Sequence, residues 1–312
     1  MQDLILKGDT ELVGAGTLGA DIFTRWTAFI DASPATVKTY TRSIRQFLKY
    51  LNDNGIGKPA RADIIAYREE LKQSHKATTV QNYIAAVKIF FQWTADEGIY
   101  PNIADRVKGA KIDREHKKDA LTSKQAAKLL NSIDRSTLKG KRDYALLSLM
   151  VTTGLRTISI IRADIGDIRN SGDSTVLYYQ GKGHEEKADY VKLAEPVNEA
   201  INSYITARGQ TTQNEPLFSS IAHRNSGERM TTKSISRICK ENMIATGLNS
   251  DRLTAHSLRH TAATLNLLNG ATIEETQQLL GHTNINTTLI YAHALERANN
   301  NSEIRIAEAI FK

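Results

Sequence analysis

The apolar pattern of this chain lapses between residues 105 and 119, and that lapse limits how the chain can divide into domains. Helical apolar spacing ends before the segment and resumes after it. Basic residues accumulate within it, namely Arg106, Lys108, Lys111, Arg114, Lys117 and Lys118. One hydrophobic core stops growing at about 250–300 residues, and this chain has 312. We therefore predict two domains, at residues 20–107 and 120–298, joined by a flexible basic linker over 108–119.

The first domain is predicted to be a bundle of four helices. Apolar residues recur with helical spacing over residues 21–30, 34–53, 63–71 and 78–97. Ser33 and Pro34 supply an N-cap and a proline at the first helical position. The start of the chain lacks such spacing and carries four glycines, so we predict a flexible N-terminal arm over 1–19.

The second domain is predicted to be mainly helical, with one small β-hairpin or sheet. Helical segments are expected at residues 121–133, 141–151, 195–207, 232–246, 257–268, 272–280 and 287–292, with a terminal one at 302–311. Two short β-type runs, 176–180 and 188–193, flank a Gly-Lys-Gly-His turn. No other segment has a convincing strand pattern, so the predicted fold class is mainly α.

Residues with chemical potential concentrate near the end of the chain. His256 and Arg259 stand one helical turn apart, so they project from the same face. His282 and Tyr291 follow within thirty-six residues of His256. A base, an anion clamp and a nucleophile that converge in this way suit attack on a phosphodiester.

Two upstream residues complete the set. Arg156 follows a glycine turn after a very apolar helix, where its guanidinium either pairs with a carboxylate or points at an oxyanion. Lys182 is expected at the tip of a glycine-flanked hairpin, where an ammonium of lowered pKa can protonate a leaving oxygen. Taken alone, the structural ion pair and the solvated lysine are the commoner outcomes.

The order and context of these motifs resemble the tyrosine recombinase, or phage integrase, family. The most specific match runs from residues 279–283 (Leu-Leu-Gly-His-Thr) through 287–291 (Thr-Thr-Leu-Ile-Tyr), and the resemblance covers most of the chain. It implies a helical core-binding, SAM-like DNA-binding domain at 20–107 and a tyrosine-recombinase catalytic domain at 120–298. In this family a tyrosine, here Tyr291, attacks a DNA phosphate and forms a 3′-phosphotyrosyl intermediate.

The resemblance also implies roles for the other residues. Arg156 and Arg259 would clamp the phosphate, and His256 would accept a proton or join the clamp. Lys182 would be the general acid, and His282 would donate a hydrogen bond to the phosphate. The phosphodiester energy is conserved in the intermediate, so neither ATP nor a metal is required and no cofactor is expected.

Double-stranded DNA is the partner that the family implies, with a homo-tetramer on two DNA sites and accessory proteins as further possibilities. Lysine and arginine outnumber aspartate and glutamate by 41 to 34, a net charge of +7. This balance favours a polyanionic partner without proving one. The basic linker is either a solvated loop or a DNA contact, and the neighbouring motifs favour the contact.

One position departs from the family pattern. Three residues after Arg156 the family commonly carries glutamate or aspartate, whereas this chain has Ser159. A serine can donate or accept a hydrogen bond but cannot neutralise charge. Because every candidate catalytic position is filled, we still expect a working enzyme.

Other chemistries are disfavoured. His256 and His260 have the spacing of a zinc pair, but no glutamate follows His256 and no third ligand accompanies them, so we expect no metal and interpret His260 as structural support. Cys239 is the single cysteine and is expected to be a buried structural thiol. No run of eighteen apolar residues and no secretory signal are present, so we expect a cytoplasmic location without membrane contact.

The end of the chain, residues 299–312, is predicted to be a helix that follows an asparagine-rich hinge. Its apolar residues need a partner surface, and they are Ile304, Ile306, Ala307, Ile310 and Phe311. Docking onto its own subunit and exchange with a neighbouring subunit both satisfy that need, and the family resemblance favours exchange.

Two alternative functions stay open from the sequence. A type IB topoisomerase shares the chemistry but nicks and reseals one strand, and the Gly-Lys-Gly-His and Leu-Leu-Gly-His motifs favour the recombinase. A DNA-binding regulator that no longer cleaves is supported only by Ser159. Within the recombinases, the sequence does not separate a mobile-element integrase from a Xer-type resolvase of DNA multimers, and it does not identify the target site.

Overall fold

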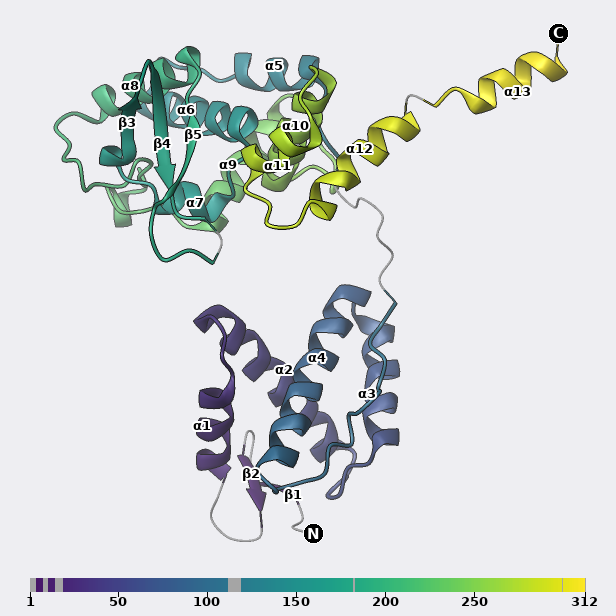
Figure 1. Cartoon of the computed structure of the whole chain (residues 1–312). Coiled ribbons are helices and arrows are strands. Elements are labelled where there is room, and N and C mark those ends of the chain that lie inside the picture. Colours follow the sequence, from purple (N-terminus) through teal and green to yellow (C-terminus); the bar gives the residue numbers. More distant parts are fainter. Residues whose placement is uncertain are drawn as a thin grey trace. The chain divides into compact units, whose positions relative to one another are not determined.

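The computed structural model describes residues 4–7, 11–14, 19–111, 119–181, 183–298 and 300–311. It divides into two compact units, residues 1–114 and 115–312, coloured purple to blue and teal to yellow in Figure 1. Lys182 and most of the linker predicted at 108–119 lie outside the described residues. No helix in the described part of the chain is long and apolar enough to cross a lipid bilayer.

The first unit contains the four predicted helices. They are α1 (Gly19–Phe29), α2 (Pro34–Asp53), α3 (Arg61–Ser74) and α4 (Ala77–Asp96). The Ser33 side chain accepts a hydrogen bond from the Thr36 amide at 3.3 Å, and Pro34 opens α2 as predicted. Helix α4 contacts the other three helices and lies at the centre of the unit (Figure 1).

Aromatic side chains fill the core of this unit. Trp26 from α1 meets Phe90 of α4 edge to face, with ring centroids 5.6 Å apart. Phe47 of α2 packs in the same way on Phe91, at 5.9 Å. All four rings are fully buried, and each such pair adds to the hydrophobic stabilisation of the bundle.

The start of the chain differs from the prediction. Strands β1 (Leu4–Lys7) and β2 (Glu11–Gly14) form an antiparallel pair in which Leu4 faces Gly14 and Lys7 faces Glu11. A flexible arm without strands was predicted for residues 1–19. Four-residue strands are too short to show an alternating pattern, and the glycines of this segment pointed away from regular structure.

The second unit is mainly helical, as predicted. Its helices are α5 (Ser123–Asn131), α6 (Leu138–Thr153), α7 (Thr157–Arg162), α8 (Glu195–Arg208), α9 (Thr232–Ala245), α10 (Ala255–Leu268), α11 (Ile273–Leu280), α12 (Asn286–Ala298) and α13 (Ser302–Ile310), with 3₁₀ turns at Ile165–Asp167 and His223–Asn225. Helix α6 packs on α8 and α10, and nearly all of its side chains from Ala145 to Val151 are buried. This helix forms the centre of the main core.

One three-stranded antiparallel sheet accompanies these helices, in the order β3 (Ile168–Ser171), β4 (Ser174–Tyr179) and β5 (Asp189–Lys192). Leu177 of β4 pairs with Ile168 on one side and with Val191 on the other. The two predicted β-runs are therefore confirmed as β4 and β5. Strand β3 was not predicted, because Ile168 is its only apolar residue and no alternation is visible.

Helix α13 forms where a terminal helix was predicted, and it has no buried residue. Its side chains Ile304, Ile306, Ile310 and Phe311 are 57–85% exposed. Docking of this helix onto its own subunit, one of the two predicted outcomes, is therefore not what the structure has.

Candidate active site

A glycine turn after α6 positions Arg156. Gly154 caps α6 in the left-handed conformation, at φ +64°, and its amide donates to the Met150 carbonyl. A Cβ at this position would lie 2.6 Å from Cδ2 of Leu280, and the positive φ would strain any other residue, so the turn strongly favours glycine. The chain then enters α7, for which Arg156 is the N-cap residue.

Helix α10 positions His256 and Arg259. The Thr254 amide donates to the Ser257 hydroxyl at 3.0 Å, which closes the first turn of the helix. Arg259 is buried, and its guanidinium donates to the Gly154 carbonyl and to the Leu280 carbonyl, at 2.6 Å each. Arg259 therefore links the end of α6 to the end of α11.

Both arginines and His256 line one pocket of about 340 Å³. The other lining residues are Leu155, Thr157, Ile158, Ser236, Thr254 and Ala255. Burial, and then the charge of Arg156, lower the pKa of Arg259 to about 10, so the Arg259 guanidinium is still charged at neutral pH. The ionisable groups that shift the pKa of Arg259 in the described part of the chain are Arg156, Tyr291 and Tyr179, and none is a carboxylate. Two neighbouring cations without a carboxylate form a site for an anion.

Tyr291 lies on α12 and is 5% exposed. It packs with Ala263 and Leu280 in a small cluster separate from the main core. Its ring lies 5.2 Å from the ring of His260, which lies 4.5 Å from that of His256. Burial raises the pKa of Tyr291 above its ordinary value, while the charges of Arg259 and Arg156 act in the opposite direction. The phenol is therefore neutral at neutral pH, and it needs a base before it can act as a nucleophile.

His282 follows Gly281, the left-handed residue that ends α11. Its Nδ1 atom lies 2.9 Å from the Thr288 hydroxyl, and its carbonyl accepts from the Gln277 side chain. Burial, and then the charges of Arg259, Arg156 and His256, lower the pKa of His282 to about 4, so the ring is neutral near pH 7. When the Thr288 hydroxyl donates to Nδ1, the ring proton is on Nε2 and can be donated to an anion.

Ser159, the departure from the family pattern, is buried in α7. Its hydroxyl donates to the Gln180 carbonyl at 2.9 Å, just after β4. The serine therefore acts as a hydrogen-bond donor at a position where the family commonly has a carboxylate, which only accepts.

The structure brings together five of the six predicted site residues, and Lys182 lies outside the described residues. The five are Arg156, His256, Arg259, His282 and Tyr291. His260, interpreted from sequence as structural support, lies between the rings of His256 and Tyr291. In the described residues no group of three or more His, Cys, Asp or Glu side chains has the arrangement to hold a metal ion.

Sequence analysis missed Tyr179 and Thr288. Tyr179 is buried at the end of β4, and its phenol interacts electrostatically with Arg259 and Arg156. Strand alternation predicts that Tyr179 is buried, but it does not show which helix covers it. Thr288 is fully buried against His282. Its place in the motif from 279 to 291 was the one signal that pointed to it.

Cys239 is the buried thiol that the sequence predicted. It lies in α9, and burial raises its pKa to about 12, so the thiolate is negligible at neutral pH.

Comparisons with known proteins agree with this geometry. The model of the phage integrase family matches residues 119–297. A second model, the N-terminal SAM-like domain of phage integrases, matches residues 29–98. Tyrosine recombinase XerC of Herpetosiphon aurantiacus is 32% identical over 268 residues, which are 83% of this chain and 84% of the relative.

Solved structures share the fold. A XerH site-specific recombinase bound to its palindromic difH substrate, in a post-cleavage complex, aligns with a TM-score of 0.71 at 20% identity, over 89% of this chain and 83% of that one. A lambda integrase tetramer bound to a Holliday junction aligns with a TM-score of 0.67 at 18% identity, over 87% and 76% of the two chains.

Proposed function

The chain belongs to the phage integrase family of tyrosine recombinases, and on that premise we propose a role for each residue of the site. The protein is a site-specific DNA recombinase, an enzyme that cleaves and rejoins DNA. The observation that carries the assignment of roles is the pocket lined by two arginines and His256, beside a tyrosine whose phenol interacts with both arginines.

In the proposed reaction, the Tyr291 oxygen attacks the scissile phosphorus and the bond from phosphorus to the 5′ oxygen breaks. A 3′-phosphotyrosyl link and a 5′-hydroxyl result. The phenol proton passes to His256, and the leaving oxygen takes a proton from Lys182. The 5′-hydroxyl of the partner strand then attacks the phosphotyrosine in the reverse sense, so no external energy source is consumed.

The arginines stabilise the charge that develops during this attack. Arg156 and Arg259 bind the nonbridging oxygens, and neutral His282 donates a hydrogen bond to one of them. The hydrogen bonds from Arg259 to the Gly154 and Leu280 carbonyls hold its guanidinium in place before substrate arrives. Little reorganisation of this side chain is therefore needed at the moment of reaction.

The nucleophile, unlike the phosphate clamp, is not yet positioned for reaction in this structure. Tyr291 is nearly buried and is not among the described residues that line the pocket. We propose that α12 shifts when DNA or a neighbouring subunit binds, and that this shift brings the phenol to the phosphate.

The first unit is proposed to be the core-binding domain, at residues 20–107. Helix α2 presents four exposed basic side chains at spacings of four, three and four residues, and they are Lys38, Arg42, Arg45 and Lys49. Such a row lies on one helix face and suits the phosphates of one DNA strand. Residues 120–298 are proposed to be the catalytic domain, and residues 108–119 the linker between the two domains.

Assembly is proposed to be a homo-tetramer on two DNA sites. The lambda integrase structure is a tetramer on a Holliday junction, and here the exposed apolar side chains of α13 need a surface to cover them. We propose that α13, in residues 299–312, docks on a neighbouring subunit. The site of action is the cytoplasm, with the DNA substrate, and accessory proteins would bind on the same DNA.

Two biological roles suit such an enzyme: integration and excision of a mobile element, and resolution of DNA multimers. The relatives named XerC and XerD favour the second role. Recombination between two copies of the DNA site that flanks the gene, scored as deletion or as integration, separates the two roles.

The direct test of the proposed chemistry is trapping of the covalent intermediate. The protein is incubated with nicked duplexes made from the DNA that flanks its gene, and SDS-resistant adducts are measured. We expect an adduct with the wild type, none with Tyr291→Phe, and an unchanged yield with Tyr190→Phe, a matched change at an exposed tyrosine. Tight binding without any adduct would contradict the proposal and favour a non-cleaving regulator. Relaxation of supercoils by the monomer without a specific site would favour the topoisomerase.

A further inference from the structure

The loop between β4 and β5, residues 180–188, is held at its start by helix α7 and at its end by the 3₁₀ turn that follows α7. Helix α7 begins directly after Arg156. The loop contains Lys182, and the described residues on both sides of Lys182 make the contacts that follow.

The first fastening is at the start of the loop. The buried Ser159 hydroxyl of α7 donates to the Gln180 carbonyl at 2.9 Å. The Gln180 side chain in turn donates to the carbonyls of His184, at 2.7 Å, and Glu185, at 3.0 Å. The residues before and after Lys182 are thereby linked to each other and to α7.

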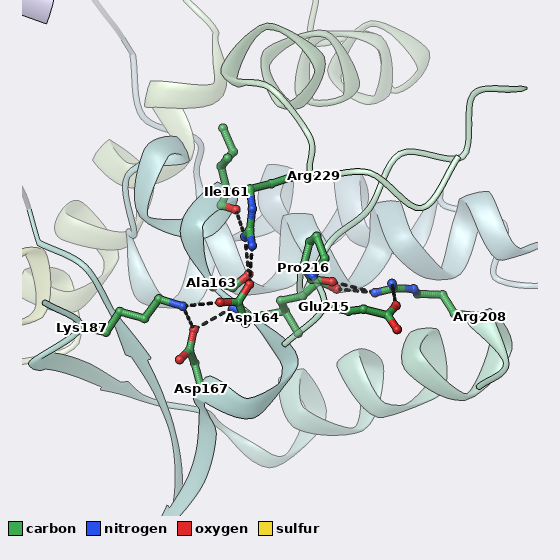
Figure 2. Close-up of polar contacts among 10 residues, drawn as sticks. Ile161, Ala163, Asp164, Asp167, Lys187, Arg208, Glu215, Pro216 and Arg229 are labelled. Atoms are coloured by element: carbon green, nitrogen blue, oxygen red, sulfur yellow. Dashed lines mark hydrogen bonds and ion pairs between the residues drawn. The ribbon is translucent and has the colours of Figure 1, made fainter. Parts of the chain in front are cut away.

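The second fastening is at the end of the loop and is ionic (Figure 2). The Lys187 ammonium lies between two carboxylates, 2.6 Å from Oδ2 of Asp164 and within hydrogen-bond distance of Asp167. The other oxygen of Asp164 accepts from Arg229, whose guanidinium also donates to the Ile161 carbonyl at 2.6 Å. Two cations and two anions therefore balance at the C-terminal end of α7.

Asp164 and Lys187 are held in their charged forms, and the bridge is partly shielded from water. Burial on its own would raise the pKa of Asp164, but hydrogen bonds and charges from Lys187 and Arg229 outweigh it and lower that pKa. Burial on its own would lower the pKa of Lys187, but Asp164 and Asp167 raise it. The side chain of Lys187 is 28% exposed and that of Asp167 only 9%. Water and salt therefore screen this bridge less than they screen a surface ion pair.

We infer that Lys187 is a positioning residue for DNA cleavage: its bridge to Asp164 and Asp167 holds the end of the β4–β5 loop on the 3₁₀ turn directly after α7, the helix that starts at the phosphate clamp. The inference rests on the proposed role of Lys182 as general acid. A proton donor must lie within hydrogen-bond reach of the leaving oxygen, and a misplacement of about 1 Å can cost on the order of 100-fold in rate. A loop held at both ends has fewer conformations than a loop held only at Gln180, and this restriction favours one reproducible position for a proton donor on the loop.

The alternative is that the bridge only stabilises the fold. Figure 2 contains a matched pair to test this, Arg208 and Glu215, which form an ion pair at 2.9 Å in the same unit. Arg208 also donates to the Pro216 carbonyl at 2.7 Å. The side chains of this pair have no contact with the β4–β5 loop in the described residues, and the Glu215 backbone carbonyl accepts from the Ile165 amide. Glu215→Gln therefore removes a comparable ion pair while keeping that backbone contact and every described contact of the loop.

The test compares two leaving groups with full-length protein. Nicked duplexes carry either the natural 5′ oxygen or a bridging 5′ sulfur at the scissile phosphate. Sulfur leaves as a thiolate, since a thiol has a pKa of about 8.5, so its departure needs no proton donor. We expect Lys187→Met to slow cleavage of the oxygen substrate about 10- to 100-fold and to cleave the sulfur substrate within about twofold of wild type. Lys187→Arg, which retains a cation, should recover most of the rate with oxygen.

Three results are informative. Equal slowing of both substrates by Lys187→Met, or slowing by Glu215→Gln to the same extent, would mean a structural role only and would overturn the inference. Normal cleavage of both substrates by Lys187→Met would also overturn it. Lys182→Ala tests the proposed general acid separately: if sulfur does not rescue Lys182→Ala, that role fails, whatever Lys187→Met does. Melting temperatures of all variants identify any that fail to fold.

Discussion

The phosphate clamp and the nucleophile are held by different parts of the second unit. Arg259 is buried on α10, and two backbone carbonyls from the ends of α6 and α11 fix its guanidinium. Its neighbour Leu258 belongs to the main core. Tyr291 lies on α12, which packs on α10 and α11 through a small cluster with Ala263 and Leu280.

The difference suggests that the phosphate clamp is fixed in the folded unit, whereas the nucleophile can move. In the clamp, Arg259 is buried and held by two backbone carbonyls, and Arg156 is half-buried at the start of α7. The nucleophile is on a helix with few buried apolar contacts, and such elements open at lower free energy than a core helix. Cleavage can therefore be controlled by what docks near α12, without any change at the arginines.

The largest expected effect comes from breaking the clamp. Arg259→Gln removes a cation from the pocket and weakens the links to the Gly154 and Leu280 carbonyls. We expect cleavage to fall about 100- to 1,000-fold and the melting temperature to fall as well. Adduct yield and thermal unfolding measure the two effects. The control is Arg162→Gln, at an exposed position on α7, which should change neither.

A second prediction loosens the nucleophile instead. Leu280→Ala removes a buried side chain that packs with Tyr291. Because α12 must leave this packed position before the phenol reaches the phosphate, we expect cleavage to become up to about 10-fold faster. Leu147→Ala in the main core should cost about 2–5 kcal/mol of global stability with a smaller change in cleavage below the melting temperature. If Leu280→Ala and Leu147→Ala had equal effects on unfolding and on cleavage, the small cluster around Tyr291 would not be distinct from the main core.

A third prediction concerns the start of the β4–β5 loop. Ser159→Glu restores the residue type common in the family, yet it places an acceptor against the Gln180 carbonyl, which is also an acceptor. An unsatisfied buried acceptor costs about 1–3 kcal/mol, so we expect up to about a 10-fold slower cleavage. Cleavage faster than that of the wild type would contradict this prediction and show that serine at position 159 lowers the rate of cleavage. Ser159→Thr retains a hydroxyl and is the matched control.

The smallest expected effect on cleavage is that of His282 ionisation. Its folded pKa, about 4, is below its ordinary value of 6.5, so the unfolded chain binds the extra proton first as pH falls. His282 therefore contributes stability that is complete above pH 6.5 and is lost as pH falls from 6.5 towards 4. We expect a loss on the order of 3 kcal/mol across that window, absent in His282→Gln, while cleavage between pH 7 and 8 shows no His282 step. Denaturant unfolding at several pH values measures the loss of stability.

Much of this fold and site follows from local sequence. Caps such as Ser33 and Gly154, and helical apolar spacing, predicted the helices, because these signals act within a few residues. Motif order predicted that Arg156, Arg259 and Tyr291 converge. Pairing partners were less predictable: β3 has one apolar residue, and the carbonyls that hold Arg259 are 105 and 21 residues away along the chain. The partners of Lys187 were not predicted either, because Asp164 and Asp167 belong to another element and no local pattern links them to the loop.

The central claim is that a fixed clamp faces a nucleophile on a separately held helix, and amide hydrogen exchange of the DNA-free protein tests it most directly. We predict that amides of α12 exchange through local opening, with protection well below that of α6 and α10, which exchange only when the unit unfolds. Equal protection of α12 and α6, both following global unfolding in denaturant, would contradict the account and place clamp and nucleophile in one rigid body.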